Sequence, residues 1–297
     1  MPAPPLPVIV NAAGGTASRA GEGLREQIEA AFAATGQPVT LELVDGHKLS
    51  AALARHANAS RVVVGGGDGT LATAAGAVSR AKGELAILPL GTLNHFAGQL
   101  KVPLDLATAA ELAVTGKARR VDLGQAGERV FINNLSAGAY VELVREREAS
   151  SLPKWLATIP ATWGTLRKLR ARGFDLTIDG DFKPVMTPLL FIGNNRYEVS
   201  EGRPGERAAL DDGLLSVYAV APLPRTALIA AALRTLVARP RMYRDFTLDE
   251  TAHEVRIAGP GATLEAALDG ERVTFDLPLT VRIVPRALAV VSPSKTG

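Results

Sequence analysis

The chain has 297 residues, of which 47% are hydrophobic and 21% are charged, so it is a soluble globular protein with room for two domains. It contains no cysteine, which excludes disulfides, thiolate metal sites and a cysteine nucleophile, and which fits a reducing cytoplasm. The net charge of +3 is spread thinly, so we expect no nucleic-acid partner. Met1–Pro7 lacks the pattern of a secretory signal and no apolar run is long enough to span a membrane, which predicts a cytoplasmic protein.

The first 120 residues or so alternate strand-like and helix-like patterns. Strands are predicted at residues 7–11, Val39–Val44, Val62–Val64 and Leu85–Leu88, and helices at Gly21–Thr35, Leu49–Ala57 and Thr70–Val78. This alternation predicts a doubly wound, Rossmann-like α/β domain with a parallel sheet, in which ligands bind at the carboxyl ends of the strands. Asn11, the glycine loop after Val64, and Gly91–Thr92 all follow such strand ends, so we expect them to line one cleft.

The turn Gly65-Gly66-Gly67-Asp68-Gly69-Thr70 lies between a buried strand and a helix. Glycines let the backbone turn sharply and approach a ligand closely, and the amides at a helix N-terminus bind phosphate. Asp68 places a carboxylate beside the expected phosphates, which requires a divalent cation between them or a substrate hydroxyl on the carboxylate. The turn therefore favours phosphoryl transfer. The alternative is an ordinary tight turn between strand and helix.

From Ala118 onwards the chain consists of short alternating segments separated by Gly, Pro, Asp and Asn, which is typical of an antiparallel β domain. The predicted strands are Arg129–Ile132, Phe174–Ile178, Leu189–Ile192, Leu214–Val220, Glu254–Ile257, Thr263–Leu268, Val273–Leu277 and Leu279–Val284. Asp269-Gly270 predicts a two-residue hairpin turn, from whose tip Glu271 would point into a cleft between the domains. Asp211-Asp212-Gly213 predicts a turn that leads into a strand.

Two helical inserts interrupt these strands. The first, Ala149–Arg172, holds Trp155 and Trp163 and ends in a basic run, a combination suited to anionic membrane headgroups. A domain-packing helix with a solvated basic end is the preferred interpretation. The second, Ala227–Arg239, is similar and weaker.

Gly66–Thr70 with its flanks resembles the signature of the diacylglycerol-kinase-type lipid kinases, a group that includes the sphingosine and ceramide kinases. NAD kinases and phosphofructokinases carry related glycine–aspartate loops. Three further segments, Pro89–Ala97, Leu210–Val217 and Leu268–Glu271, match the lipid kinases in order and spacing, and Val8–Gly15 resembles the family's Asn-Pro-x-Ser-Gly opening. The resemblance covers nearly the whole chain.

This resemblance implies two domains. Residues 1–122 would form the α/β nucleotide-binding catalytic domain, to which the chain returns at about residues 287–297. Residues 123–286 would form an antiparallel β-sandwich that carries the lipid surface, and its Phe131–Asn134 segment resembles the family's Phe-x-Asn. The nucleotide would bind between the two domains.

The resemblance also implies an ATP- and Mg²⁺-dependent lipid kinase. ATP would be bound by Asn11, Gly65, Gly66, Gly67, Asp68, Gly69, Thr70, Gly91, Thr92 and Asn94. Glu271 would be the general base, with Asp269 beside it and Asp68 in the active centre. A structural Mg²⁺ would be bound by Asp212, paired with Asp211, and by backbone carbonyls including that of Leu214.

His95 departs from the family pattern, because many members have aspartate at this position. Ala12 likewise replaces a proline, which changes loop stiffness rather than chemistry. Two other functions stay open: a kinase of a soluble substrate, as in the NAD kinases that carry a related loop, and, because of His95, a nucleotide-binding regulator without turnover. The acceptor could be diacylglycerol, phosphatidylglycerol, a sphingoid base or ceramide. A lipid acceptor implies peripheral contact at the inner face of the membrane, and an exposed strand edge of the β domain could support a homodimer.

Overall fold

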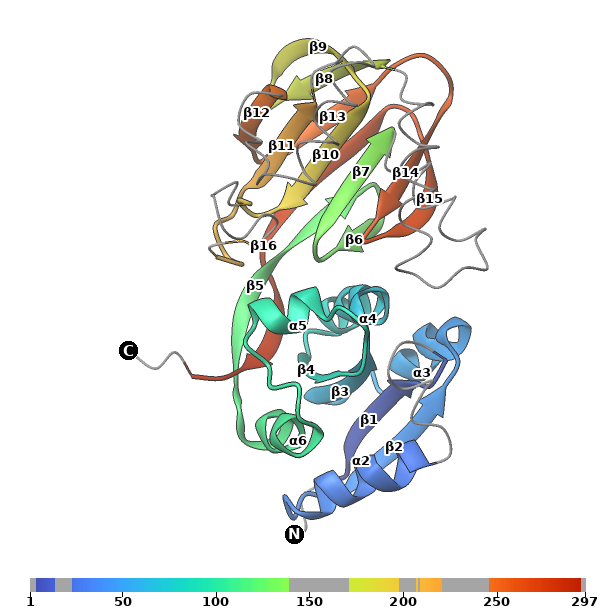
Figure 1. Cartoon of the computed structure of the whole chain (residues 1–297), viewed down its shortest axis with the longest axis vertical. Helices are drawn as coiled ribbons and strands as arrows, with labels where there is room; N and C mark the ends of the chain where they lie inside the picture. Colours follow the sequence, from blue (N-terminus) through green and yellow to red (C-terminus); the bar gives the residue numbers. More distant parts are fainter. Residues whose placement is uncertain are drawn as a thin grey trace, which may run out of the picture. The chain divides into compact units, whose positions relative to one another are not determined.

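The computed structural model describes residues 4–13, 23–138, 171–197, 207, 209–220 and 246–294. The chain forms two compact units (Figure 1). The α/β unit comprises Met1–Leu123, Val130–Ile132 and Val284–Gly297, and the β unit comprises Gly124–Arg129 and Asn133–Ile283.

The α/β unit contains a parallel sheet with strand order β2-β1-β3-β4-β16. Its complete elements are β1 (Leu6–Asn11), α2 (Leu24–Ala33), β2 (Val39–Val44), a 3₁₀ turn (Gly46–Lys48), α3 (Leu49–Arg55), β3 (Arg61–Gly66), α4 (Asp68–Ala81), β4 (Glu84–Pro89), α5 (His95–Gln99) and α6 (Leu106–Thr115). Three strands are divided between the two units. The α/β unit contains the first part of β5 (Lys117–Ala126), most of β6 (Arg129–Phe131) and the last part of β16 (Leu279–Ser292). This confirms the α/β class predicted from the alternating patterns.

Helices cover both faces of this sheet, with α2 and α6 together on one face and α3 and α4 together on the other (Figure 1). Val8, Val10 and Val63 pack with the buried stripe of α2, which is formed by Leu24, Ile28, Ala31 and Phe32. Ile9 and Val64 alternate with these strand residues and are fully buried toward the other face. A strand buried on both faces explains the continuous apolar runs in the sequence.

Arg61, at the start of β3, binds the end of α6. Its Nη1 donates to the carbonyls of Ala113 at 2.8 Å and Val114 at 2.9 Å, its Nη2 donates to the carbonyl of Gly116 at 3.0 Å, and its Nε donates to Glu84 Oε2 at 2.9 Å. These carbonyls lie in the last turn of the helix, where no intrahelical partner exists and a cation is favourable.

We therefore expect Arg61→Met to lower the free energy of unfolding by about 2 kcal/mol, because several charge-assisted hydrogen bonds are lost together. Urea denaturation followed by circular dichroism measures the change. Arg25→Met removes an exposed helical ion pair with Glu29 and is the matched control, with an expected change of at most about 0.5 kcal/mol. Equal effects of the two substitutions would contradict this role of Arg61.

The β unit contains two sheets, which confirms the predicted antiparallel β-sandwich. Its elements are the end of β5, β7 (Asn134–Gly138), β8 (Arg172–Ile178), β9 (Asp181–Thr187), β10 (Leu189–Asn194), β11 (Leu215–Val220), β12 (Phe246–Ala252), β13 (Glu254–Ala258), β14 (Thr263–Leu268), β15 (Glu271–Asp276) and the first part of β16. One sheet has strand order β12-β11-β10-β7-β14-β15, and in the other β16 pairs with β13, followed by β8 and β9.

Alternating hydrophobicity does not predict β5, β7, β9 or β12. β7 has the sequence Asn-Leu-Ser-Ala-Gly, which contains no β-branched or aromatic residue, and it is a strand because β10 and β14 pair with it on both sides. β9 contains Pro184, which is tolerated because β9 is an edge strand among the strands that the structure describes. Tertiary pairing, rather than local pattern, creates these strands.

The two predicted helical inserts lie almost entirely outside the described residues. Arg172 is an exception and a correction, because it begins strand β8 instead of ending a helix. Its Nη2 donates to the carbonyl of Pro260 at 3.0 Å and its guanidinium lies over the ring of Phe174. Within the described ranges, no helix combines the length and hydropathy needed to cross a bilayer.

Candidate active site

The carboxyl ends of β1, β3 and β4 meet at one edge of the parallel sheet. Gly65 lies opposite Val10 on one side and Leu88 on the other, and Gly66 lies opposite Pro89. The structure therefore brings together the Asn11, Gly65–Thr70 and Gly91 segments, as expected from strands that run in the same direction.

The glycine turn is packed too closely for side chains. A Cβ atom on Gly66 would lie 2.6 Å from the Cβ of Thr70, whose Oγ1 accepts a hydrogen bond from Asn11 Nδ2 at 3.0 Å. Helix α4 begins at Asp68, two residues earlier than its helical propensity predicts, so Asp68 and Gly69 belong to the first helical turn. The amides of this turn lie at the positive end of the helix dipole.

The loop after β4 packs directly on this turn. A Cβ atom on Gly91 would lie 2.4 Å from the Cα of Gly67, so the two backbones are in contact. Asn94 holds the loop: its Oδ1 accepts from the amide of Gly91 at 2.8 Å, and its Nδ2 donates to the carbonyls of Gly91 at 3.0 Å and Pro89 at 3.3 Å. The side chain of Asn94 thus organises the loop, whereas Thr92 beside it is exposed.

Asp68 ties the two loops together through its carboxylate. Oδ2 accepts from the amide of His95 at 3.2 Å and Oδ1 accepts from the amide of Phe96 at 2.9 Å. The side chain of Phe96 is buried and that of His95 is exposed. The carboxylate of Asp68 therefore lies at the N-terminus of α4, where two backbone amides of the next loop donate to it.

In the β unit, Asp269 and Gly270 form the turn between β14 and β15. Their φ angles of +50° and +86° are those of a two-residue I′ turn, which confirms the hairpin predicted from Asp-Gly. Oδ1 of Asp269 accepts from the amides of Asn133 at 2.7 Å and Asn134 at 3.0 Å. Asp269 therefore fastens the hairpin tip to the start of β7.

Glu271 follows this turn and is exposed. It lies opposite Leu268 and shares its face of β15 with Val273 and the buried Phe275. Glu271 therefore stands at the exposed end of a row whose last member, Phe275, packs in the core.

Asp211 and Asp212 are exposed in the loop before β11. The amide of Asp212 donates to Asn195 Oδ1 at 2.9 Å, and the carbonyl of Leu214 accepts from the amide of Asn195 at 3.0 Å. No cluster of three or more metal-ligating side chains occurs within the described ranges. The residues nevertheless fit Mg²⁺, because that ion needs only one or two carboxylates, completed by waters and by carbonyl oxygens that have a second lone pair.

Sequence reasoning missed a buried polar network in the β unit. Arg207, Asn194 and Asn195 are at most 7% exposed, and Ser216 is fully buried. The Ser216 hydroxyl donates to the carbonyl of Asn195 at 2.6 Å and accepts from the amide of Tyr197 at 3.2 Å. The adjacent asparagines at the end of β10 are a weak signal of this network, and Arg207 has none.

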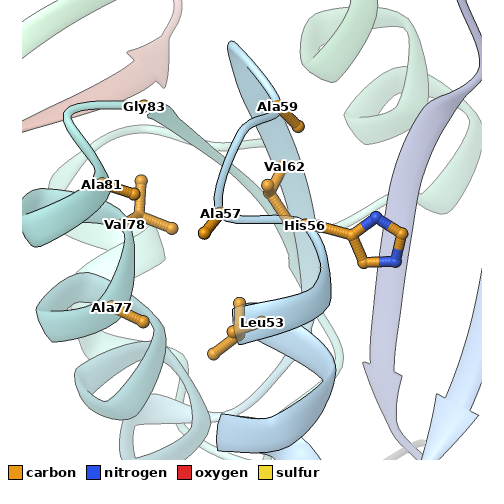
Figure 2. A pocket seen from close by; sticks show the side chains of 9 residues that line it. All are labelled: Leu53, His56, Ala57, Ala59, Val62, Ala77, Val78, Ala81 and Gly83. Atoms are coloured by element: carbon orange, nitrogen blue, oxygen red, sulfur yellow. The ribbon is translucent and has the colours of Figure 1, made fainter.

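A small cavity in the α/β unit is not a substrate site. Its volume of about 10 Å³ is no larger than one water molecule requires. Its lining includes Leu53, Val62 and Val78, and Figure 2 shows the imidazole of His56 turned away from the other side chains. His56 Nε2 instead contacts Glu42 Oε1 at 2.6 Å, and Arg55 also donates to Glu42.

The hydrogen bond with His56, helped by Arg55 and opposed by partial burial, lowers the pKa of Glu42 from its usual 4.5. The ionised carboxylate therefore stabilises the fold above pH 4.5, and this contribution is lost as the pH falls through the lowered pKa. We expect the stability of Glu42→Gln to fall less than that of the wild type when the pH is lowered from about 5 to about 3, because glutamine does not titrate. The urea midpoint at each pH measures the stability. Glu111→Gln, on the exposed face of α6, is the control, and parallel pH curves for wild type and Glu42→Gln would contradict the expectation.

Comparison with known proteins agrees with this architecture. Residues 5–126 match the diacylglycerol kinase catalytic domain, and residues 135–292 match the YegS C-terminal NAD kinase beta sandwich-like domain. A Pseudomonas putida protein named probable lipid kinase YegS-like is 36% identical over 205 residues, which are 67% of this chain and 67% of that protein. A protein of the same name from Pseudomonas aeruginosa is 34% identical over 174 residues, 55% of each.

A crystal structure of a diacylglycerol kinase from Bacillus anthracis superimposes with a TM-score of 0.69 at 18% identity, covering 99% of this chain and 98% of that one, which shows a shared fold. The two family models place both parts of the chain among the diacylglycerol-kinase-type proteins. The chain belongs to the diacylglycerol-kinase-type, YegS-like lipid kinase family.

Proposed function

We propose that this protein transfers the γ-phosphoryl group of ATP to a hydroxyl group of a membrane lipid. The observation that carries the proposal is the edge of the parallel sheet, where the turn before α4, the Gly91 loop and the carboxylate of Asp68 are held together by backbone contacts. Helix amides with closely packed glycines bind phosphates, and family membership supports a phosphotransferase.

Each unit has its own part in this proposal. The α/β unit binds ATP through Asn11, Gly65–Thr70 and the Gly91-Thr92 loop, with Asp68 in the active centre and Asn94 fixing the loop. The β unit supplies Glu271, which accepts the proton of the lipid hydroxyl as the hydroxyl attacks phosphorus. Asp269 stands next to this base, at the hairpin tip.

Mg²⁺ is the proposed cofactor, bound in the β unit by Asp211, Asp212 and the carbonyl of Leu214. When bound, the ion neutralises negative charge and rigidifies its loop. Because ATP is the donor and the acceptor is a lipid, we place the reaction in the cytoplasm, at the inner face of the membrane.

The test is transfer of label from γ-labelled ATP, with Mg²⁺, into diacylglycerol, phosphatidylglycerol, sphingosine and ceramide in mixed micelles, with NAD⁺ in a parallel reaction. Label in one of the lipids supports the proposal and identifies the acceptor. Label only in NAD⁺ would replace it with a soluble-substrate kinase, and ATP binding without any labelled product would favour a regulator. Full activity in excess EDTA would remove the metal from the proposal.

A further inference from the structure

Arg207 is a cation held inside the β unit, only 7% exposed. Its Nη1 donates to the carbonyl of Asn194 at 3.0 Å and its Nη2 donates to Asn133 Oδ1 at 3.1 Å. Its Cζ lies 5.5 Å from the centroid of the Tyr197 ring. Removing a guanidinium from water is costly unless its N–H groups find acceptors, so Arg207 holds these neighbours in place.

Asn133 connects Arg207 to the hairpin between β14 and β15. The carbonyl of Asn133 accepts from the amide of Asn194 at 2.8 Å and from the hydroxyl of Tyr197 at 3.0 Å. Its own amide donates to Asp269 Oδ1 at 2.7 Å, and the amide of Asn134 donates to the same oxygen at 3.0 Å. The amide of Asp269 in turn donates to the carbonyl of Asn134 at 2.9 Å, which extends the β7–β14 ladder by one pair.

The consequence concerns Glu271, which follows Asp269 by two residues. Among the described strands, β15 pairs with β14 alone, so the position of the hairpin tip depends on how β14 and the turn are joined to β7. Beyond the β7–β14 ladder, the turn is joined to β7 by the carboxylate oxygen of Asp269. This oxygen accepts from two backbone amides, and Arg207 and Tyr197 hold the residue of the first, Asn133.

We propose that Arg207, Asn133 and Asp269 are positioning residues that fix the location of Glu271, and that Asp269 acts through the two amides rather than by touching the substrate. This inference rests on the proposed function, because it requires Glu271 to be the base. It assigns a role to Arg207 that no motif in the sequence indicates.

The first test is amide hydrogen exchange of the full-length protein without ligand. Arg207→Met and Asp269→Gly should raise the exchange rates of the Asn133 and Asn134 amides about tenfold or more. Glycine is chosen because it removes the carboxylate while tolerating the φ of +50° at this position. Arg207→Lys keeps the positive charge but lacks the planar fork that reaches two acceptors, so it should raise the exchange rates less than Arg207→Met does.

Arg256→Met, at an exposed position of β13 in the other sheet, is the matched control and should leave the Asn133 and Asn134 amides unchanged. Unchanged exchange at these two amides in both Arg207→Met and Asp269→Gly would overturn the inference.

The second test is steady-state kinetics with whichever of the four lipids the wild type labels fastest. A misplaced base lowers kcat, so Arg207→Met and Asp269→Gly should lose on the order of 10- to 100-fold in kcat with little change in KM for ATP. Asp269→Asn keeps an acceptor oxygen for the two amides and should retain kcat within about fivefold of wild type. A loss in Asp269→Asn as large as in Asp269→Gly would show that the charge itself is needed, and would overturn the positioning role.

Failure of this inference differs from failure of the proposed function. If Glu271→Gln abolishes labelling whereas Arg207→Met and Asp269→Gly do not lower it, only the inference is wrong. If Glu271→Gln retains full activity, or if the wild type labels none of the lipids, the role of Glu271 fails and the inference fails with it.

Discussion

Replacing Glu271 with glutamine is expected to lower kcat for lipid phosphorylation by about 10²- to 10⁴-fold, which is the usual contribution of a general base. Glutamine has the same shape and exposure but cannot accept the proton of the attacking hydroxyl. Because Glu271 lies at the exposed end of β15, the fold should be unaffected, with the same urea midpoint as the wild type. The assay is label transfer from ATP at saturating lipid.

Glu265→Gln is the matched control for this prediction. Glu265 is an exposed glutamate in β14 of the same hairpin, on the outward row that includes Thr263. Its substitution should change kcat less than about twofold. Equal effects of Glu265→Gln and Glu271→Gln would show that hairpin charge, rather than one base, matters.

Replacing Gly91 with alanine is expected to weaken ATP binding at least about tenfold, because the new methyl group would lie 2.4 Å from the Cα of Gly67 and 2.6 Å from Asn94 Oδ1. The backbone of Gly67 cannot rotate away as a side chain can, so the glycine turn and the loop after β4 must separate. Isothermal titration calorimetry with ATP measures the affinity, and thermal denaturation reports the accompanying loss of stability, about 1–3 kcal/mol.

Gly98→Ala is the control for this substitution. Gly98 lies in α5, seven residues further along, and a Cβ atom there meets nothing within 4 Å. Because alanine favours a helix over glycine, this variant should bind ATP as the wild type does and be no less stable. An unchanged ATP affinity in Gly91→Ala would contradict the assignment of this edge as the nucleotide site.

In the α/β unit, β1 to β4 and α2 to α4 are predictable from sequence because each carries a local signal, whereas α5, α6 and β5 are not predicted. The stripe of Leu24, Ile28 and Phe32 defines α2, and the valines of β3 form a strand buried on both faces. The error at α4 has a local cause: Asp68 and Gly69 have low helix propensity, yet they begin the helix because a first turn tolerates acidic residues and Gly67 precedes it in an extended conformation.

The β unit is predictable only in part, because pairing between distant strands determines it. The Asp269-Gly270 turn is a local feature and follows from two residues. By contrast, the hydrogen bond from Asn133 to Asp269 joins residues 136 positions apart, and that from Arg207 to Asn133 joins residues 74 positions apart. Local sequence patterns do not predict such contacts, so the role of Arg207 can be inferred only from the structure.

The candidate site divides in the same way. Its glycines are predictable because the close approach of the backbones at this strand–helix turn leaves no room for a Cβ atom. The use of the Asn94 side chain within its own loop is not predictable, since an asparagine can equally contact a ligand. The hydrogen bonds from the amides of His95 and Phe96 to Asp68 are not predictable either, because they depend on how two separate loops pack together.

The most direct test of the proposed kinase activity is label transfer from γ-labelled ATP into the lipid panel by wild type and Glu271→Gln, with ATP affinity measured on the same preparations. The account predicts a labelled lipid with the wild type, at least about 100-fold less with Glu271→Gln, and equal ATP affinity for the two proteins. ATP binding by the wild type without label in any lipid would contradict it.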